Sequence, residues 1–223
     1  MINLIHQMEA GELRYTQPEV GSRRFTFLIR RFDSPKGVWE SSASDIKSCT
    51  RKIGEKAANN IIMHKNKKYL DKAIECLQRN DISIVTLNEA EYPAQLKNIY
   101  DPPAILYYKG NFPESNVPSI AVVGSRTPSS YGMYVARKLS YELASAGIVV
   151  VSGLARGIDG ASHFGALNAR GHTIGVLGCG IDIVYPLESK RYYDEMAEKG
   201  TIVSEYPIGT KPIAGNFPAR NRI

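Results

Sequence analysis

One pattern occurs four times between Ser119 and Ile223: an apolar, β-rich segment is followed by a turn that contains glycine and then by a helix-like segment. The four apolar segments are Ile120–Gly124, Ile148–Gly153, Ile174–Gly178 and Thr201–Glu205. Their apolar character is continuous rather than alternating, which is typical of strands buried on both faces of a parallel sheet. Strands and helices that alternate in this way predict an α/β fold with a parallel sheet.

The turns that follow these strands carry several basic side chains and few acids. In parallel sheets, ligands bind at the carboxyl ends of the strands, where glycines let backbone N–H groups and helix N-termini reach an anion. The basic residues of this edge are Arg126, Arg156, Lys190, Arg220 and Arg222. The sequence therefore predicts a phosphate-binding edge.

The first two turns favour phosphate binding, each with a plainer alternative. Gly124 permits a tight turn, Ser125 offers a hydroxyl, and Arg126 can give bidentate hydrogen bonds to a phosphate or instead pair with a nearby carboxylate. In the second turn, Gly153 and Gly157 keep side chains away from the backbone. Asp159 is placed to cap the next helix and, at i and i+4, to touch His163; we interpret that pair as structural rather than as a metal or catalytic site.

The third turn contains Gly178-Cys179-Gly180, but the third glycine of a dinucleotide-binding fingerprint is absent. Glu205, at the end of the next strand, can imitate the acid that binds ribose, yet a lone G-x-G is weak support for an NAD-dependent dehydrogenase. Cys179 has no histidine in its motif, so we expect a small residue at the end of a strand rather than a nucleophile.

The final segment, Asn216–Ile223, is the most specific. It places an aromatic ring beside two arginines and two amides, a composition that suits single-stranded nucleic acid through base stacking and contacts to the backbone. The site residues predicted here are Phe217, Arg220, Asn221 and Arg222. The alternative is that Phe217 is simply buried.

The first third of the chain has a different period. Phe25, Leu28, Ile29 and Phe32 share one helix face, and residues 21–78 read as a small helical region. Arg23, Arg24, Arg30 and Arg31 fall largely off that face and are interpreted as a solvated helix surface, with direct contact to DNA as the alternative. Strand-like segments follow at Ile82–Leu87 and Ala104–Tyr108.

Composition excludes several classes of protein. The chain of 223 residues has a net charge of +6, divided equally at +3 before and after the boundary between residues 117 and 118, so it has no basic tail. Three scattered cysteines argue against a disulfide framework and a zinc site. Because neither a membrane-length apolar run nor a signal peptide is present, we expect a cytoplasmic protein.

The motifs together resemble the DNA-processing protein A (DprA/Smf) family. The matching segments are Val123–Arg126, Ser152–Asp159 with His163, Leu177–Asp182 with Tyr185-Pro186, Ser204–Pro207, Phe217–Arg222 and, upstream, Glu91–Pro93, Asp101–Leu106 and Lys109–Asn111. The resemblance begins near Gly54 and is loose from Leu28 to Asp45.

The resemblance implies an extended Rossmann-like domain over residues 81–223 and a helical, SAM-like domain over residues 1–80. It implies a non-enzymatic protein that binds single-stranded DNA without sequence preference, forms homodimers and loads the RecA recombinase during natural transformation. No cofactor or metal is implied, and no membrane contact. The DNA-binding residues that it implies are Arg126, Gly153, Gly178, Gly180, Phe217, Arg220, Asn221 and Arg222, with Lys190 as an addition. The glycine turns themselves add Gly124, Ser125 and Arg156 to the predicted site.

Two departures from the family pattern and one alternative function remain open. The family usually has Asn at the position of Ser189, and it continues beyond the motif in which this chain stops at Ile223. We therefore expect a partial chain that is weakly stable or prone to aggregation. The alternative is a related Rossmann-like enzyme that cleaves a nucleotide or NAD-like compound with Asp159 or Glu205 as its acid, and a third is a remnant that has lost its activity.

Overall fold

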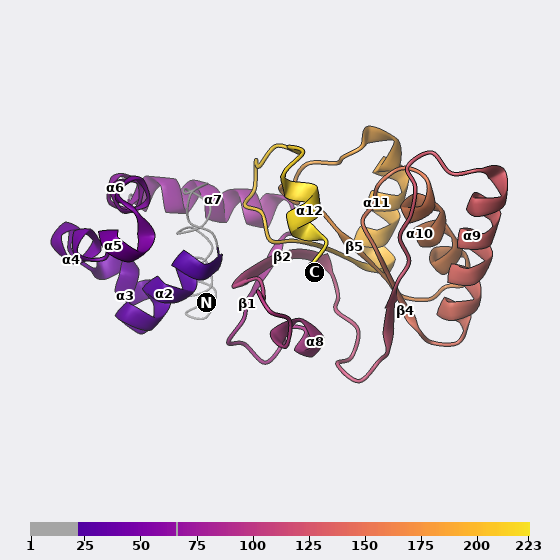
Figure 1. Cartoon of the computed structure of the whole chain (residues 1–223), viewed down its shortest axis with the longest axis horizontal. Coiled ribbons are helices and arrows are strands. Elements are labelled where there is room, and N and C mark those ends of the chain that lie inside the picture. The colour runs from indigo at the N-terminus through magenta and orange to yellow at the C-terminus, as the bar shows by residue number, and fades with distance from the viewer. Residues whose placement is uncertain (1–21, 66) are drawn as a thin grey trace. The chain divides into compact units, whose positions relative to one another are not determined.

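The computed structural model describes residues 22–65 and 67–223 (Figure 1). These residues form two compact units. One comprises the described residues up to Tyr92 together with Leu96–Leu106, and the other comprises Pro93–Gln95 and Tyr107–Ile223. Among the described residues, no helix is long and apolar enough to cross a membrane. The sequence predicts that the N-terminal segment is not a signal peptide. That segment lies outside the described residues.

The first unit is mainly helical, as its periodicity predicts. Phe25, Leu28, Ile53 and Ile61 are buried in its core. In chain order its helices are α2 (Ser22–Phe32), α3 (Pro35–Glu40), α4 (Ala43–Ser48), α5 (Thr50–Ile53), α6 (Glu55–His64) and α7 (Lys67–Arg79), coloured indigo to purple in Figure 1.

The start of α4 shows how a short helix is stabilised in this unit. The Ser42 hydroxyl accepts a hydrogen bond from the backbone N–H of Asp45 (3.1 Å), and the Asp45 carboxylate accepts one from the backbone N–H of Ser42 (3.1 Å). This reciprocal capping box satisfies two donors that a helix start otherwise leaves unpaired. From the sequence alone, Ser44-Asp45 is a plausible cap for this helix; in the structure the cap is Ser42, and Asp45 is its partner.

The strands of the second unit form a mixed sheet, whose colours in Figure 1 run from magenta at β2 to orange in the later strands. Its order is β2-β6-β5-β4-β3, and β1 (Ser83–Thr86) is hydrogen-bonded to β2. The remaining bounds are β2 (Ile105–Gly110), β3 (Ser119–Ala121), β4 (Val149–Ser152), β5 (Thr173–Val176) and β6 (Thr201–Ser204). The strands β3 to β6 are parallel, as predicted, whereas β2 runs antiparallel to β6 with Tyr107 opposite Ser204.

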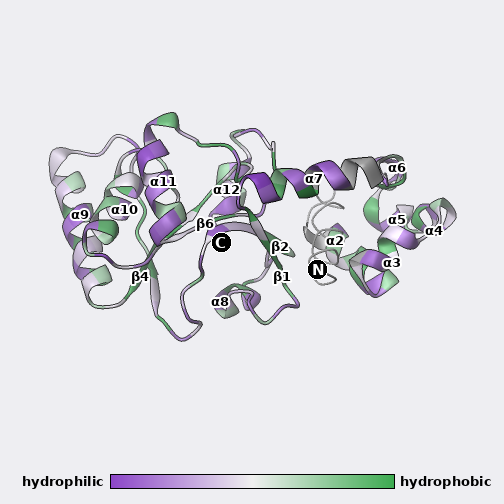
Figure 2. Cartoon of the chain, turned by 180° about the vertical axis from the view of Figure 1, so that it is seen from behind, coloured by the Kyte–Doolittle hydropathy of each residue, from purple (hydrophilic) through white to green (hydrophobic). Residues whose placement is uncertain are grey.

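Burial across the sheet depends on the position of each strand. Strands β4, β5 and β6 are largely buried, as their continuous apolar character predicts. Ile120 and Ala121 of β3 are exposed, against the same prediction, because β3 is the last strand of the described sheet and has one neighbour, β4. In Figure 2 the strands β1 and β2 are coloured hydrophobic, whereas much of α7 and α11 is hydrophilic.

Three helices connect the parallel strands, and α10 (Ile158–Asn168) packs against both α9 (Ser130–Ser145) and α11 (Lys190–Lys199). The helical period of this segment predicts a buried face made of Val135, Ala136, Leu139, Leu143 and Ala146. This prediction is wrong in part, because Val135 and Leu139 are exposed. Small residues face inward instead: Ala136, Ser140 and Ala144 are buried. The chain also contains α8 (Ala94–Lys97), a 3-10 turn at Leu187–Ser189 and α12 (Asn216–Arg220).

Candidate nucleic-acid interface

A cavity of about 420 Å³ lies at the carboxyl edge of the parallel strands. Because β3, β4, β5 and β6 are parallel, the turns that follow them meet at this edge. The predicted site residues that line this first cavity are Gly124, Arg126, Gly153, Phe217, Arg220, Asn221 and Arg222. A second cavity of about 620 Å³ shares Arg126, Gly153, Ala155 and Phe217 with the first, so the two adjoin.

Phe217 is the aromatic centre of this edge. The guanidinium carbon of Arg126 lies 5.3 Å from the centroid of the Phe217 ring, within the range of a cation–π contact. The ring of Tyr185 lies 5.7 Å away on the side of the second cavity, tilted by 35°. A Cβ atom on Gly178 would lie 2.8 Å from Cδ1 of Phe217, so a glycine is needed for the ring to lie this close to the strand end.

The turn after β3 keeps its backbone donors available. Across the described residues, the N–H groups of Gly124, Ser125 and Arg126 have no hydrogen-bond acceptor, and Arg126 has no carboxylate partner. The Ser125 hydroxyl accepts a hydrogen bond from the backbone N–H of Thr127 at 3.1 Å. Three N–H groups and an exposed guanidinium are the donors that a phosphate oxygen requires.

Arg220 is an internal residue rather than a free cation. Only 7% of its surface is exposed, and its Nη1 donates to the backbone carbonyls of Gly153 (3.0 Å) and Val176. Burial lowers the pKa of the Arg220 guanidinium, and the Asp159 carboxylate partly offsets this effect. A Cβ atom on Gly153 would lie 2.6 Å from both terminal nitrogens of Arg220, so this glycine makes room for the arginine.

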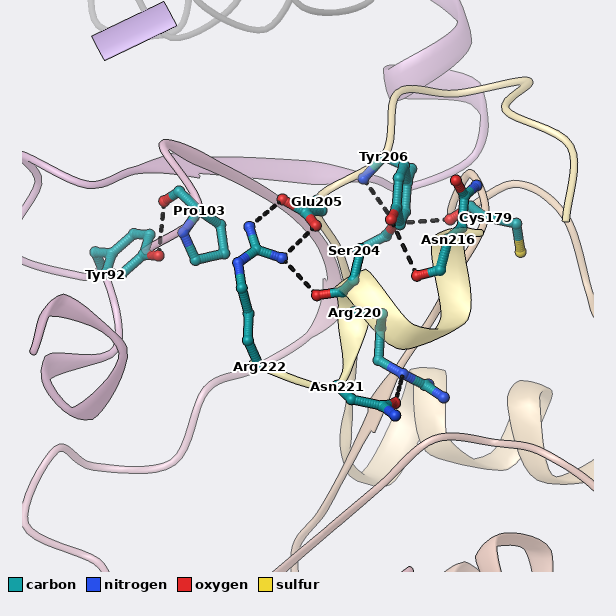
Figure 3. Close-up of polar contacts among 11 residues, drawn as sticks. Tyr92, Pro103, Cys179, Ser204, Glu205, Tyr206, Asn216, Arg220, Asn221 and Arg222 are labelled. Carbon is teal, nitrogen blue, oxygen red and sulfur yellow. Dashed lines mark hydrogen bonds and ion pairs between the residues drawn. The ribbon is translucent and has the colours of Figure 1, made fainter. Parts of the chain in front are cut away.

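Arg222 is neutralised by an internal acid. Its two terminal nitrogens donate to the two carboxylate oxygens of Glu205, each at 2.6 Å, and Nη1 also donates to the carbonyl of Ala219 at 2.8 Å (Figure 3). Glu205 is 4% exposed at the end of β6. The bidentate pair therefore ties the segment after α12 to the sheet, and Arg222 has little charge left for a ligand.

The other predicted residues contribute less to the cavities. Arg156 lines the second cavity and pairs with Glu188 at 2.8 Å, and Lys190 pairs with Asp194 at 2.8 Å and lines neither cavity. Gly180 also lines neither; a Cβ atom there would lie 2.7 Å from the Pro207 carbonyl, and its N–H donates to the Thr210 carbonyl. The Gly180 amide is thus used internally.

The expected contact between Asp159 and His163 is replaced by two others. Asp159 accepts a hydrogen bond from the backbone N–H of Gly153 (3.2 Å), and the cap position of α10 is Gly157. The Thr173 hydroxyl donates to the Val150 carbonyl, so its oxygen accepts from Nδ1 of His163 at 2.8 Å. Burial lowers the pKa of His163 to about 3, with a further contribution from Arg220, which keeps the imidazole neutral.

Neither metal binding nor nucleophilic chemistry is supported by the titratable groups. No group of three or more His, Cys, Asp or Glu side chains is placed to hold a metal ion among residues 22–65 and 67–223. Burial raises the pKa of the Cys179 thiol to about 11, and its sulfur donates to the Ile183 carbonyl. A thiol of this kind is a poor nucleophile at neutral pH.

Sequence reasoning missed Tyr185 as a member of the site. It lies 32 positions before Phe217 in the sequence, outside the predicted set, and it is 42% exposed. The signal that was present is the Tyr185-Pro186 pair of the family motif, which places an aromatic residue in the loop after β5.

The sequence model of DNA recombination-mediator protein A matches residues 83–223. The chain belongs to this family. Protein Smf of Synechocystis is 36% identical over 200 residues, which cover 88% of this chain and 50% of that protein. DNA processing protein DprA of Bacillus subtilis is 41% identical over 155 residues, which cover 69% of this chain and 52% of that protein. The chain thus spans about half the length of these two relatives.

Two solved structures of the family are similar to this one. That of DprA from Streptococcus pneumoniae has a TM-score of 0.80 at 30% identity and covers 97% of this chain and 73% of its own. That of DprA from Helicobacter pylori has a TM-score of 0.54 at 34% identity and covers 62% of this chain and 63% of its own; its description concerns a single-stranded DNA binding mode of that protein. The likeness confirms the α/β, Rossmann-like fold class.

Proposed function

We propose that this chain binds single-stranded DNA without sequence preference, in the cytoplasm and without catalysing a reaction. The observation that carries the proposal is the stack of Arg126, Phe217 and Tyr185 between two adjoining cavities. Aromatic faces accept any base, and a guanidinium group holds the sugar–phosphate backbone. The description of the Helicobacter pylori relative supports the same ligand.

We propose different parts for the residues of this edge. Arg126 and the N–H groups of residues 124–126 contact phosphate, while Phe217 and Tyr185 contact bases. Arg220 and Arg222 hold the site together from inside, through Gly153 and Glu205. Fewer basic residues therefore contact DNA than the sequence brings to this edge.

Replacing Arg126 tests the proposal. Arg126→Ala is expected to weaken binding to oligo-dT by about tenfold, equally for other base compositions, and to reduce the slope of log Kobs against log salt by about 0.7, because one cation no longer contacts a phosphate. The measurement is fluorescence anisotropy at several salt concentrations. Lys138→Ala, which removes an exposed lysine on α9, is the control. Unchanged affinity in Arg126→Ala, or equal affinity of the wild type for duplex DNA, would contradict the proposal.

We further propose that the bound strand is passed to a RecA recombinase and that the complete protein is a homodimer in this role. The support for both steps is family membership. The expected result is that the chain accelerates RecA assembly on DNA coated with single-strand-binding protein, measured as DNA-dependent ATP hydrolysis by RecA. Sedimentation of the full-length protein measures the oligomeric state, and a monomer would contradict the dimer.

Cleavage of a nucleotide or NAD-like compound has less support. Its candidate acids are both engaged: Asp159 accepts from Gly153, and Glu205 is paired with Arg222. Turnover of mononucleotides or NAD, measured by product release, would favour the enzyme over the DNA-binding protein.

A further inference from the structure

The basic residues of the chain are concentrated in its helical region rather than around the candidate interface. Between residues 22 and 79 the sequence has 14 Lys and Arg residues against 6 Asp and Glu residues, an excess of 8, although the whole chain has a net charge of +6. An excess of this size in one region favours a polyanionic partner.

Part of this excess gathers at the turn between α5 and α6, which we call the basic turn and define as residues 49–56. Arg51 and Lys52 lie on α5, and Lys56 lies in the first turn of α6. Gly54 joins the two helices with a φ of 88°, a conformation that residues other than glycine rarely adopt. Arg24 of α2 adds a cation from another helix, since its Nη2 lies 3.9 Å from the position of a Cβ atom on Gly54.

The three cations that lie on the basic turn itself are exposed, and no acid is paired with them among the described residues. These cations are Arg51, Lys52 and Lys56. The one acid between residues 49 and 62 is Glu55. Elsewhere in the unit two exposed cations are paired with acids: Lys36 with Glu40 and Arg79 with Glu75. The basic turn thus differs from an ordinary solvated helix face, where charges of both signs alternate.

The basic turn is also fixed in place by buried residues on both sides of Gly54. Ile53, Ala57, Ala58 and Ile61 are at most 1% exposed, so the two helices are anchored in the core on both sides of Gly54. Anchored helices keep the three side chains in one neighbourhood, and the cost of ordering them on binding is reduced accordingly.

We propose that the basic turn is a second contact surface for the sugar–phosphate backbone of DNA, separate from the candidate interface. It binds phosphates and reads no sequence, because it offers cations and lacks an aromatic side chain for base stacking. The proposal rests on the proposed function for the identity of the polyanion. The consequence is that a long strand has phosphate contacts at the basic turn in addition to those around Phe217, whereas a short strand bound around Phe217 lacks them.

The test compares two triple variants that each remove one arginine and two lysines from the helical region. The first is Arg51→Ala/Lys52→Ala/Lys56→Ala. The matched control is Lys36→Ala/Lys72→Ala/Arg79→Ala, whose residues are exposed and lie outside the basic turn. Circular dichroism and urea unfolding establish that both fold like the wild type. Affinity for oligo-dT of about 40 and of about 6 nucleotides is then measured by anisotropy over a range of salt concentrations.

The basic-turn variant is expected to bind the long oligonucleotide about tenfold more weakly, with a salt slope smaller by about 2, and to bind the short one normally. The control variant is expected to stay within about twofold of the wild type for both. Equal effects of the two variants on the long oligonucleotide would overturn the proposal, because charge alone would then explain them. It would also be overturned if the basic-turn variant lost affinity for phosphatidylserine vesicles and kept its affinity for DNA.

The same titrations separate this inference from the proposed function. Arg126→Ala without effect on the short oligonucleotide contradicts the candidate interface, whereas the basic turn is judged by the long oligonucleotide alone. A wild-type chain that binds neither oligonucleotide overturns both.

Discussion

At the scale of single residues, the arginines of the candidate interface have different roles despite similar positions in the sequence pattern. Arg126 is exposed beside Phe217, Arg220 is buried against backbone carbonyls, and Arg222 is paired with Glu205. The sequence predicts that they meet, because parallel strands end at one edge. It does not predict their partners, since Glu205 is 17 positions from Arg222 and Arg220 bonds to Gly153, 67 positions away.

Gly178→Ala tests how closely the Phe217 ring must lie to the strand end. A methyl group there would be 2.8 Å from Cδ1 and 3.0 Å from Cε1 of the ring, so the ring has to move away from Arg126 and Tyr185. Affinity for oligo-dT is expected to fall by about fivefold to tenfold, because roughly 1 kcal/mol or more of stacking is lost. The measurement is anisotropy with the same oligonucleotide.

Gly215→Ala is the matched control for this substitution. Gly215 has φ of −67°, and a Cβ atom there would have no neighbour within 4 Å. It also lies two positions before Phe217, in the same segment. Equal affinities of the two alanine variants would mean that the Phe217 position does not determine binding.

At the scale of helices and strands, the continuous apolar segments predicted the buried strands β4, β5 and β6 correctly. The prediction of buried residues failed where packing depends on residues of another element. Residues Ala136, Ser140 and Ala144 of α9 are buried because α10 approaches closely; a Cβ atom on Gly165 of α10 would lie 2.3 Å from the Arg137 carbonyl. A pattern of large apolar residues cannot reveal an interface made of small ones. The antiparallel pairing of β2 was likewise invisible in its composition.

Glu205→Gln tests whether the ion pair at the end of β6 fixes α12. The substitution removes the negative charge opposite the Arg222 guanidinium, whose side chain is 24% exposed, so the free energy of unfolding is expected to fall by about 1–3 kcal/mol. Because α12 carries Phe217, affinity for oligo-dT is expected to fall as well. Urea unfolding and anisotropy measure the two effects.

The control for that variant is Glu142→Gln, which removes an acid from an exposed pair with Lys138 (3.9 Å). An exposed pair of this kind contributes about 0.5 kcal/mol or less. If Glu205→Gln proves as stable as Glu142→Gln and binds DNA normally, α12 is held in place by apolar packing rather than by the ion pair.

At the scale of the whole molecule, averages taken over large parts of the sequence concealed local differences. Dividing the chain after residue 117 gives +3 on each side, yet residues 22–79 carry an excess of 8 basic residues. Acids outside that range lower the net charge of the whole chain to +6. The average over each half therefore gave no reason to interpret the arginines on α2 as anything but a solvated surface. That interpretation concerns Arg23, Arg24, Arg30 and Arg31. For the basic turn, the described structure adds which cations lie together and which are paired.

The stability of the whole chain is expected to decrease in mild acid because of His163. Its pKa is about 3 in the folded protein, since burial opposes the charged form, against about 6.5 in an unfolded chain. Between these two values the unfolded chain binds a proton that the native chain does not, so the free energy of unfolding falls as the pH falls below about 6.5. At about pH 5 the loss amounts to roughly 2 kcal/mol from this group.

His163→Gln removes the titrating group while keeping a donor that can reach Thr173. Urea unfolding near pH 7.5 and near pH 5 is expected to show a difference smaller than that of the wild type by roughly 2 kcal/mol, whatever the substitution does to stability at neutral pH. His172, whose pKa burial also lowers, contributes in the same direction, so part of the pH dependence remains. An unchanged pH dependence in His163→Gln would mean that His163 becomes protonated without unfolding, which its complete burial and the nearby charge of Arg220 oppose.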